Sequence, residues 1–210
     1  MKKYFLLTLF LSCFFGVAQP ITVSTTQYSV QELVTEVLIN TPCAEISNIT
    51  WSTGTNNGSV NGLGYFSNTN QNFPMSNGVI LSTSAATDAP GPQGSPINSG
   101  SWPGDQQLFD YMTALGIDPG LDDYNDASII EFDFLPFTDQ MSFNFLFASR
   151  EYGQYQCSYS DAFAFFLTNT VTGEITNLAL VPNTNDPISV ITIRDEEFNP
   201  SNQNCPSVNP

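Results

Sequence analysis

The chain has 210 residues, of which 41% are hydrophobic and 11% charged, with 20 acidic residues against 4 basic ones and no histidine. The lack of histidine excludes a histidine-based catalytic triad and a zinc–histidine site, and the negative charge argues against nucleic acid and anionic lipid as partners. The sequence has neither a G-x-S-x-G elbow nor a glycine-rich phosphate loop, so nothing in it supports hydrolase or nucleotide chemistry.

The amino terminus has the pattern of a secretory signal peptide. Lys2 and Lys3 precede an apolar run at residues 4–15, and Ala18 offers a small-residue cleavage point. The run is short for a membrane span, and no later segment is long enough, so we expect export without membrane insertion. Residues 1–18 are therefore predicted to be removed, and residues 19–210 to form a single secreted domain.

Cleavage would leave a strongly acidic mature chain. Both lysines leave with the signal peptide, so only Arg150 and Arg194 face the 20 acidic residues, a formal charge of −18. Such an excess of one charge destabilises the compact state through self-repulsion. Counter-ions or bound cations would relieve it, and a divalent metal ion is the natural candidate.

Three cysteines lie outside the signal peptide: Cys43, Cys157 and Cys205. Disulfides persist in exported proteins, and we expect one between Cys157 and Cys205, although the sequence allows three pairings. One cysteine is left over. Because the chain ends in CPSVNP without a terminal strand or sorting domain, we expect the domain to be truncated, with its anchor or sorting domain downstream.

The first half predicts one short helix and then strands joined by loops. Ser29 and the glutamate three residues later form a capping box ahead of apolar residues at helical spacing. From Ile46 onward Ser, Thr, Asn and Gly dominate, with short strands expected at residues 62–66 and 78–81. This composition is typical of strands and loops.

A loop rich in Pro, Gly and Ser is expected at residues 90–104, followed by a second helix that Asp105 caps and Gly116 ends. Four or five strands follow, at residues 128–135, 140–149, 162–168, 174–181 and 187–193. Without a βαβ rhythm, this spacing predicts an all-β fold, a β-sandwich or jelly-roll-like domain with two short inserted helices.

The two strands at residues 140–149 and 162–168 are predicted to form the centre of the core. Alternation places Met141, Phe143, Phe145 and Phe147 on one strand face, which we expect to be buried. The run at residues 162–167 is apolar on both faces, as in a strand between two layers.

Several segments in fixed order carry a family resemblance. F-x-F-x-F-A-S-x-E-Y at residues 143–152, D-A-F-A-F-F-L at residues 161–167, EFDFLP at residues 131–136 and NFPMSNGVILSTS at residues 72–84 resemble the choice-of-anchor L family of secreted bacterial surface domains. The resemblance implies an extracellular β-sandwich module of a surface protein, with no established catalytic residues. Together with the composition it favours a non-enzymatic module that serves adhesion or surface display. Its extracellular ligand is unidentified, and a glycan or another surface polymer is the candidate.

Six acidic residues are candidate ligands for a calcium ion. Asp and Asn side chains crowd residues 118–126, here called the acidic loop, and two further acids bracket a strand connection. The candidates are Asp118, Asp122, Asp123, Asp126, Glu151 and Asp161. The spacing is not that of an EF-hand. The alternative is a solvated loop whose acids cap turns and accept backbone hydrogen bonds, and the sequence leaves both open.

A second function, of a different class, is a domain that binds or cleaves carbohydrate. It requires an exposed aromatic platform, for which Trp102 and Tyr152 are the candidates, beside a carboxylate such as Glu151 or Asp161. Trp102, inside the Pro/Gly-rich loop, is expected to be exposed. If those rings pack inside, only the surface-module interpretation stands.

Overall fold

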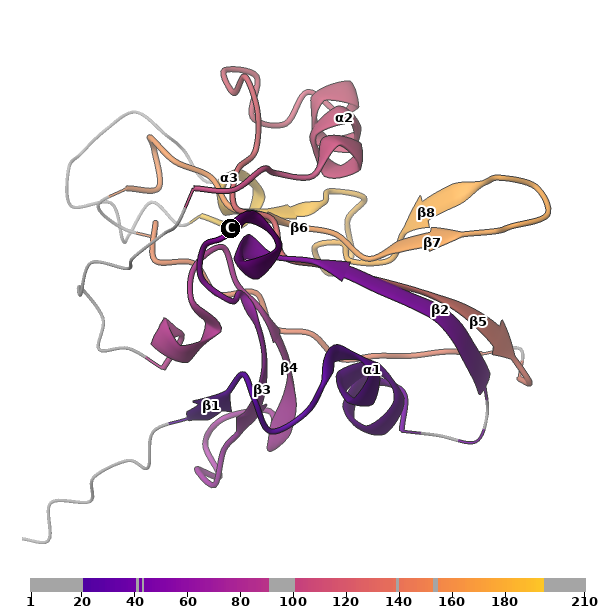
Figure 1. Cartoon of the computed structure of the whole chain (residues 1–210). Coiled ribbons are helices and arrows are strands. Elements are labelled where there is room, and N and C mark those ends of the chain that lie inside the picture. Colours follow the sequence, from indigo (N-terminus) through magenta and orange to yellow (C-terminus); the bar gives the residue numbers. More distant parts are fainter. Residues whose placement is uncertain are drawn as a thin grey trace, which may run out of the picture.

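The computed structural model describes residues 21–40, 42, 44–90, 101–138, 140–152 and 155–194 (Figure 1). The predicted signal peptide lies outside these residues. In chain order the elements are β1 (Thr22–Ser24), α1 (Val30–Glu32), the π-helical η1 (Leu33–Leu38), β2 (Ala44–Ser52), the 3-10 helix η2 (Gly54–Asn57), β3 (Leu63–Ser67), β4 (Asn77–Leu81), the 3-10 helix η3 (Ala86–Asp88), α2 (Gln106–Ala114), β5 (Ile129–Pro136), β6 (Ala162–Phe163), β7 (Phe166–Thr168), β8 (Ile175–Asn177), β9 (Ile188–Ser189) and α3 (Val190–Ile193).

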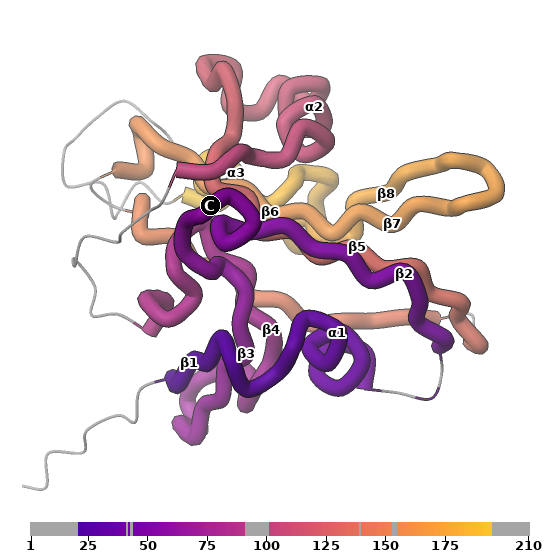
Figure 2. The backbone as a smooth tube through the Cα atoms, viewed as in Figure 1, coloured from indigo at the N-terminus to yellow at the C-terminus, as the bar shows by residue number. Residues whose placement is uncertain are grey.

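The described strands form small antiparallel sheets, in the orders β1-β3-β4, β2-β5, β6-β9 and β7-β8. Figure 2 shows the β2–β5 ribbon and the β7–β8 hairpin extending to the same side of this view. The all-β class predicted from the sequence is confirmed. The sandwich arrangement stays a prediction, since these pairings do not join into two continuous sheets.

The first predicted helix begins where the capping box places it. Glu32 N donates to Ser29 Oγ at 3.3 Å, and Ser29 N donates to Glu32 Oε2 at 2.7 Å. The turn continues as η1, which buries Leu33 and Val34. The reciprocal hydrogen bonds satisfy two donors that a helix start otherwise leaves without partners, so the local sequence is enough to begin this helix.

The predicted strand at residues 140–149 is not formed. No residue of this segment belongs to a strand, and Met141, Phe145 and Leu146 are 42%, 36% and 48% exposed. The expectation that one whole face of the segment is buried is therefore wrong for Met141 and Phe145. Phe143 and Phe147, the other two members of that face, are half-buried.

Ring contacts still align this segment with β6 and the residues that follow it. The centroids of Phe143 and Phe165 lie 4.2 Å apart, and those of Phe145 and Phe163 lie 5.5 Å apart. The two pairs run in opposite directions along the chain, which is the order of antiparallel neighbours. The rings thus cover one another, and this mutual contact takes the place of the second layer that the alternation predicted.

The predicted strand at residues 187–193 is a strand for only two residues. It turns into α3, where Thr192 N donates to Ser189 Oγ at 3.3 Å and Ser189 N donates to Thr192 Oγ1 at 2.9 Å. The β-branched run VITI favoured a strand, but the buried capping box satisfies the backbone in a helical turn instead.

Trp102 lies in the core, so the expected exposure of its ring is wrong. Its side chain is 3% exposed, and its Nε1 donates to the carbonyl of Ala127 at 2.8 Å. The backbone of Trp102 donates to Asp126 Oδ1 at 2.8 Å and accepts from Asp126 N at 2.9 Å. Because the indole N–H finds a carbonyl inside the protein, the ring can be buried at little cost.

These bonds join residues 101–104 to residues 124–127 in a structure we call the clasp. Pro103 and Asn125 form a β-bridge, and Ala127 N donates to the carbonyl of Pro103 at 3.2 Å. The two backbones approach so closely that a Cβ on Gly104 would lie 1.8 Å from the carbonyl oxygen of Tyr124. Glycine at this position is therefore required by space.

Replacing Gly104 with alanine should lower the free energy of unfolding by about 3 kcal/mol, because the clasp must open to admit the methyl group. The matched control is Gly120→Ala, since a Cβ there meets no atom within 4 Å, and its effect should stay within about 0.5 kcal/mol. Urea denaturation of both variants measures the difference. Equal stabilities would contradict the close approach.

Candidate functional site

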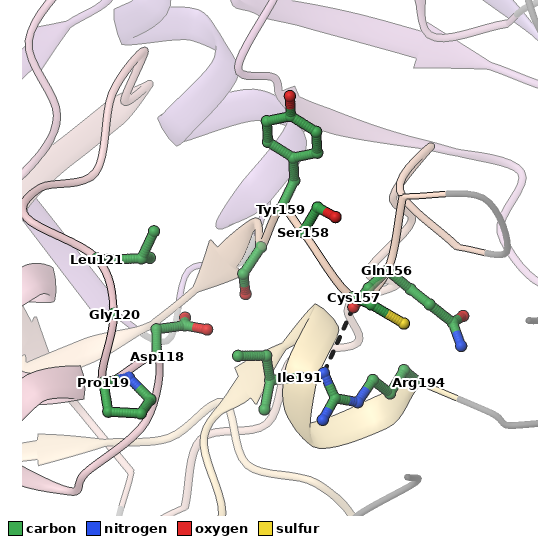
Figure 3. Close-up of a pocket in the computed structure, with 11 residues that line it drawn as sticks. Asp118, Pro119, Gly120, Leu121, Gln156, Cys157, Ser158, Tyr159, Ile191 and Arg194 are labelled. Atoms are coloured by element: carbon green, nitrogen blue, oxygen red, sulfur yellow. Dashed lines mark hydrogen bonds between the residues drawn. The ribbon is translucent and has the colours of Figure 1, made fainter. Parts of the chain in front are cut away.

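A pocket of about 190 Å³ opens between the start of the acidic loop and the connection before β6 (Figure 3). Residues 118–121 and 156–160 form its walls, together with Ile191 and Arg194 near the end of α3. Two of the predicted site residues, Asp118 and Cys157, line it.

Helix α2 and its termination set the position of Asp118. Asp105 caps the helix, as predicted, through a 2.7 Å hydrogen bond from Leu108 N to its Oδ1. At the other end Gly116, with φ of +71°, donates to the carbonyl of Thr113, and Ile117 N donates to that of Met112. This is a Schellman motif, which satisfies the last carbonyls of the helix and turns the chain sharply. Asp118 follows the motif directly.

The carboxylate of Asp118 is buried and half satisfied. The residue is 7% exposed and has a φ of +53°, a backbone conformation that is uncommon for residues other than glycine. The Tyr124 hydroxyl donates to its Oδ2 at 2.6 Å, whereas its Oδ1 is buried with no hydrogen-bond partner.

Tyr124 holds this carboxylate from the far side of the acidic loop. Its ring is 8% exposed and meets the edge of Phe109 on α2, with centroids 6.1 Å apart. Burial, followed by the hydrogen bond to Asp118 and its charge, raises the pKa of Tyr124 above its usual range. The phenol therefore stays protonated and keeps donating at any physiological pH.

The second group of acids closes the connection between residues 149 and 161. Ser149 Oγ donates to Asp161 Oδ2 at 2.8 Å, and Asp161 N donates to Glu151 Oε2 at 3.0 Å. Glu151 N donates in turn to Ser149 Oγ at 3.1 Å, while the carbonyl of Asp161 accepts from Val190 N at 3.0 Å. The two acids predicted to lie near each other do so, as acceptors within this connection.

Like charges and burial disturb the ionisation of this group. Burial raises the pKa of Glu151 to about 7, and the negative charges of Asp161 and, to a smaller extent, Asp118 add to this rise. The hydrogen bond from the backbone of Asp161 acts in the opposite direction and lowers the pKa. Burial also raises the pKa of Asp161, although hydrogen bonds from Ser149 and Thr83 oppose it. Burial and the charge of Asp161 raise the pKa of Tyr152 to about 12.

The predicted calcium ligands occupy different places. Asp122 and Asp123 are exposed, and Asp126 belongs to the clasp, where it accepts from Trp102. Within the part of the chain that the structure describes, no three acidic, cysteine or histidine side chains are grouped so as to hold a metal ion. The acidic loop is therefore packed against the protein at both ends and exposed in its middle.

The aromatic candidates are also distributed differently from the expectation. Trp102 is buried, and Tyr152 is half-buried beside Asp161. Near the pocket, Tyr155 and Tyr159 are exposed instead, at 48% and 61%, with ring centroids 6.0 Å apart. Tyr159 lines the pocket. The sequence did not single out Tyr159 among its aromatic residues, and it gave no role to Tyr124, although both tyrosines lie close to candidate acids in the sequence.

Cys157 is not a free thiol in the structure. Cys43 and Cys205 both lie outside the described residues, so the pairing of Cys157 with Cys205 stays a prediction.

Comparison with known proteins gives one match. The chain matches the family model described as the Choice-of-anchor L domain over residues 22–210. No curated protein and no solved structure matches the chain. Among the described helices, none has both the length and the apolar character needed to cross a membrane. The family match includes every residue of the pocket and of the clasp.

The raised pKa of Glu151 predicts a stability that falls as pH rises. Between the ordinary value of 4.5 and about 7, the folded state keeps a proton that the unfolded chain has lost, so folding weakens across this window and levels off above it. After allowance for solvent screening of this half-buried group, the loss should be about 1–2 kcal/mol.

Glu151→Gln should remove much of this slope, because glutamine still accepts the backbone hydrogen bond but carries no charge. The slope due to Asp161 should remain. Glu174→Gln, at an exposed position, is the matched control and should leave the slope unchanged. Urea denaturation from pH 4 to pH 8 in the presence of a chelator measures both, and an unaltered slope in Glu151→Gln would refute the assignment.

Proposed function

Because the chain belongs to the Choice-of-anchor L domain family, we propose that it works as a non-enzymatic module at the bacterial surface, where it presents loops for adhesion to an extracellular partner. The family match over residues 22–210 carries this proposal. The family consists of secreted or surface-associated bacterial modules. Adhesion is the specific role that we add.

The loops around the pocket support a binding role. The clasp fixes one side of the acidic loop, and the bonds between Ser149, Glu151 and Asp161 fix the connection opposite. Loops held by a rigid scaffold are the usual carriers of recognition in extracellular domains. On this connection Tyr155 and Tyr159 expose large rings, which combine apolar area with a polar edge.

A glycan is the ligand class that this surface favours among the candidates. Tyr159 lines a pocket that also contains the Ser158 and Ser160 side chains and the carboxylate of Asp118. Sugars bind to aromatic faces flanked by hydrogen-bonding groups. Cleavage of the glycan is less well supported, because Glu151 and Asp161 both accept hydrogen bonds within their own connection.

Surface exposure is tested by adding protease to intact cells that produce the full chain. We expect the protein to be digested without lysis, since a surface module is accessible from outside. Protection until the cells are broken would contradict the proposal. The same cells provide the adhesion assay, in which deletion of the gene should reduce attachment and the purified protein should compete for it.

The double variant Tyr155→Ala and Tyr159→Ala should reduce attachment about tenfold if these rings form the contact, since exposed tyrosines at an interface often contribute more than 1 kcal/mol each. The matched control is Val171→Ala, at a side chain 92% exposed in the turn between β7 and β8. A glycan array identifies the ligand class. Full attachment by the tyrosine variant would place the contact elsewhere.

A further inference from the structure

We propose that Asp118 binds a calcium ion through its Oδ1, at the wall of the pocket between residues 118–121 and residues 156–160. This inference concerns a binding site and does not depend on adhesion. It also differs from the sequence prediction, because it assigns the ion to one inward-facing carboxylate and not to the exposed acids of the acidic loop.

One oxygen atom of the Asp118 carboxylate lacks a hydrogen-bond partner. Asp118 is more than nine-tenths buried, and its Oδ1 has no hydrogen-bond partner. Leaving a buried carboxylate oxygen without a donor is unfavourable, because the oxygen loses its hydration and gains no replacement. Native proteins seldom leave such a group unsatisfied, and a bound ion or water molecule is a common partner for it.

The position of the Asp118 carboxylate also supports the site. Tyr124 occupies Oδ2 from one side. Asp118 also lines the pocket, and Figure 3 shows its side chain directed from the acidic loop toward Ile191. The φ of +53° holds Asp118 in this unusual orientation, a local strain of the kind that gathers at ligand sites.

Neighbouring carboxylates add negative charge near Asp118. Glu151 and Asp161 lie close enough for their charges to affect each other, and the charge of Asp118 reaches Glu151 as well. Arg194 lies across the pocket, where its Nη1 donates to the carbonyl of Gln156 at 3.4 Å, and Ile191 separates it from Asp118 in Figure 3. A cation beside Asp118 would relieve the repulsion among the three carboxylates.

The chemistry of the pocket fits a hard ion. Calcium takes six to eight oxygen ligands, including main-chain carbonyls and water. The pocket offers the hydroxyls of Ser158 and Ser160 besides Asp118, and its volume of about 190 Å³ has room for an ion with several waters. With one carboxylate as the anionic ligand, the affinity should be that of weak extracellular sites, with a Kd of about 10⁻⁴–10⁻³ M.

Terbium luminescence tests the site, using the purified full chain freed of metal with a chelator. Terbium replaces calcium and emits when a nearby tyrosine is excited, and Tyr124 lies against the same carboxylate. We expect saturable emission that calcium displaces. Asp118→Asn should lower the emission at least about tenfold at a fixed terbium concentration near the Kd. The matched control, Asp122→Asn, removes an exposed acid of the same loop and should keep it.

A second variant locates the ion without removing its ligand. Tyr124→Phe should lose the part of the emission that Tyr124 sensitises, while Tyr159, which also lines the pocket, sensitises the rest, and calorimetric titration with calcium should still detect binding. Emission that persists in Asp118→Asn, or that disappears in Asp122→Asn alone, would overturn the assignment, and the latter would place the ion among the exposed acids. Absence of binding to the unmodified protein would mean that Oδ1 is satisfied by water. None of these results bears on cell attachment, so the adhesion proposal stands or falls separately.

Discussion

The described site depends on the clasp between residues 101–104 and 124–127. Its hydrogen bonds bury Trp102 and fix the carboxyl end of the acidic loop, and Tyr124, at its edge, then reaches back to Asp118. The amino end of the same loop is fixed by the termination of α2 at Gly116. A loop held at both ends can keep a carboxylate buried and at positive φ, which an unrestrained loop would release to water.

The chain combines this rigidity with unfavourable electrostatics. A protein with 20 acidic and 4 basic residues would be expected to keep its acids at the surface. Instead Asp118, Glu151 and Asp161 are withdrawn from water in two neighbouring connections, and burial raises the pKa of both Glu151 and Asp161. Carboxylates with raised pKa values gather at functional sites, which makes these connections the most informative part of the molecule.

Elements whose signals are local were predictable from the sequence. The capping box at Ser29, the cap at Asp105 and the helix end at Gly116 are satisfied within a few residues of chain, and all three form as expected. β3 and β4 likewise lie close to the ranges that their flanking turns predicted. Short-range hydrogen bonds leave the distant parts of the chain little influence over such elements.

The burial and contacts of individual side chains were less predictable, because they depend on partners that are remote in sequence. The buried indole of Trp102 donates to the carbonyl of Ala127, 25 residues away in the chain. The Pro/Gly-rich sequence around Trp102 gave no sign of this partner. Phe145 pairs with Phe163 across the connection and stays partly exposed, although alternation predicted burial.

The acids show the same limit most clearly. The sequence grouped six of them by composition and proximity, but composition cannot tell an acid that caps a turn from one that faces a pocket. Asp118 and Asp122 are four residues apart in one loop, yet one is buried against a tyrosine and the other is exposed. What separates them is the helix end before the first and the clasp after the second. For the calcium site proposed at Asp118, the position of that single side chain therefore matters more than the number of acids around it.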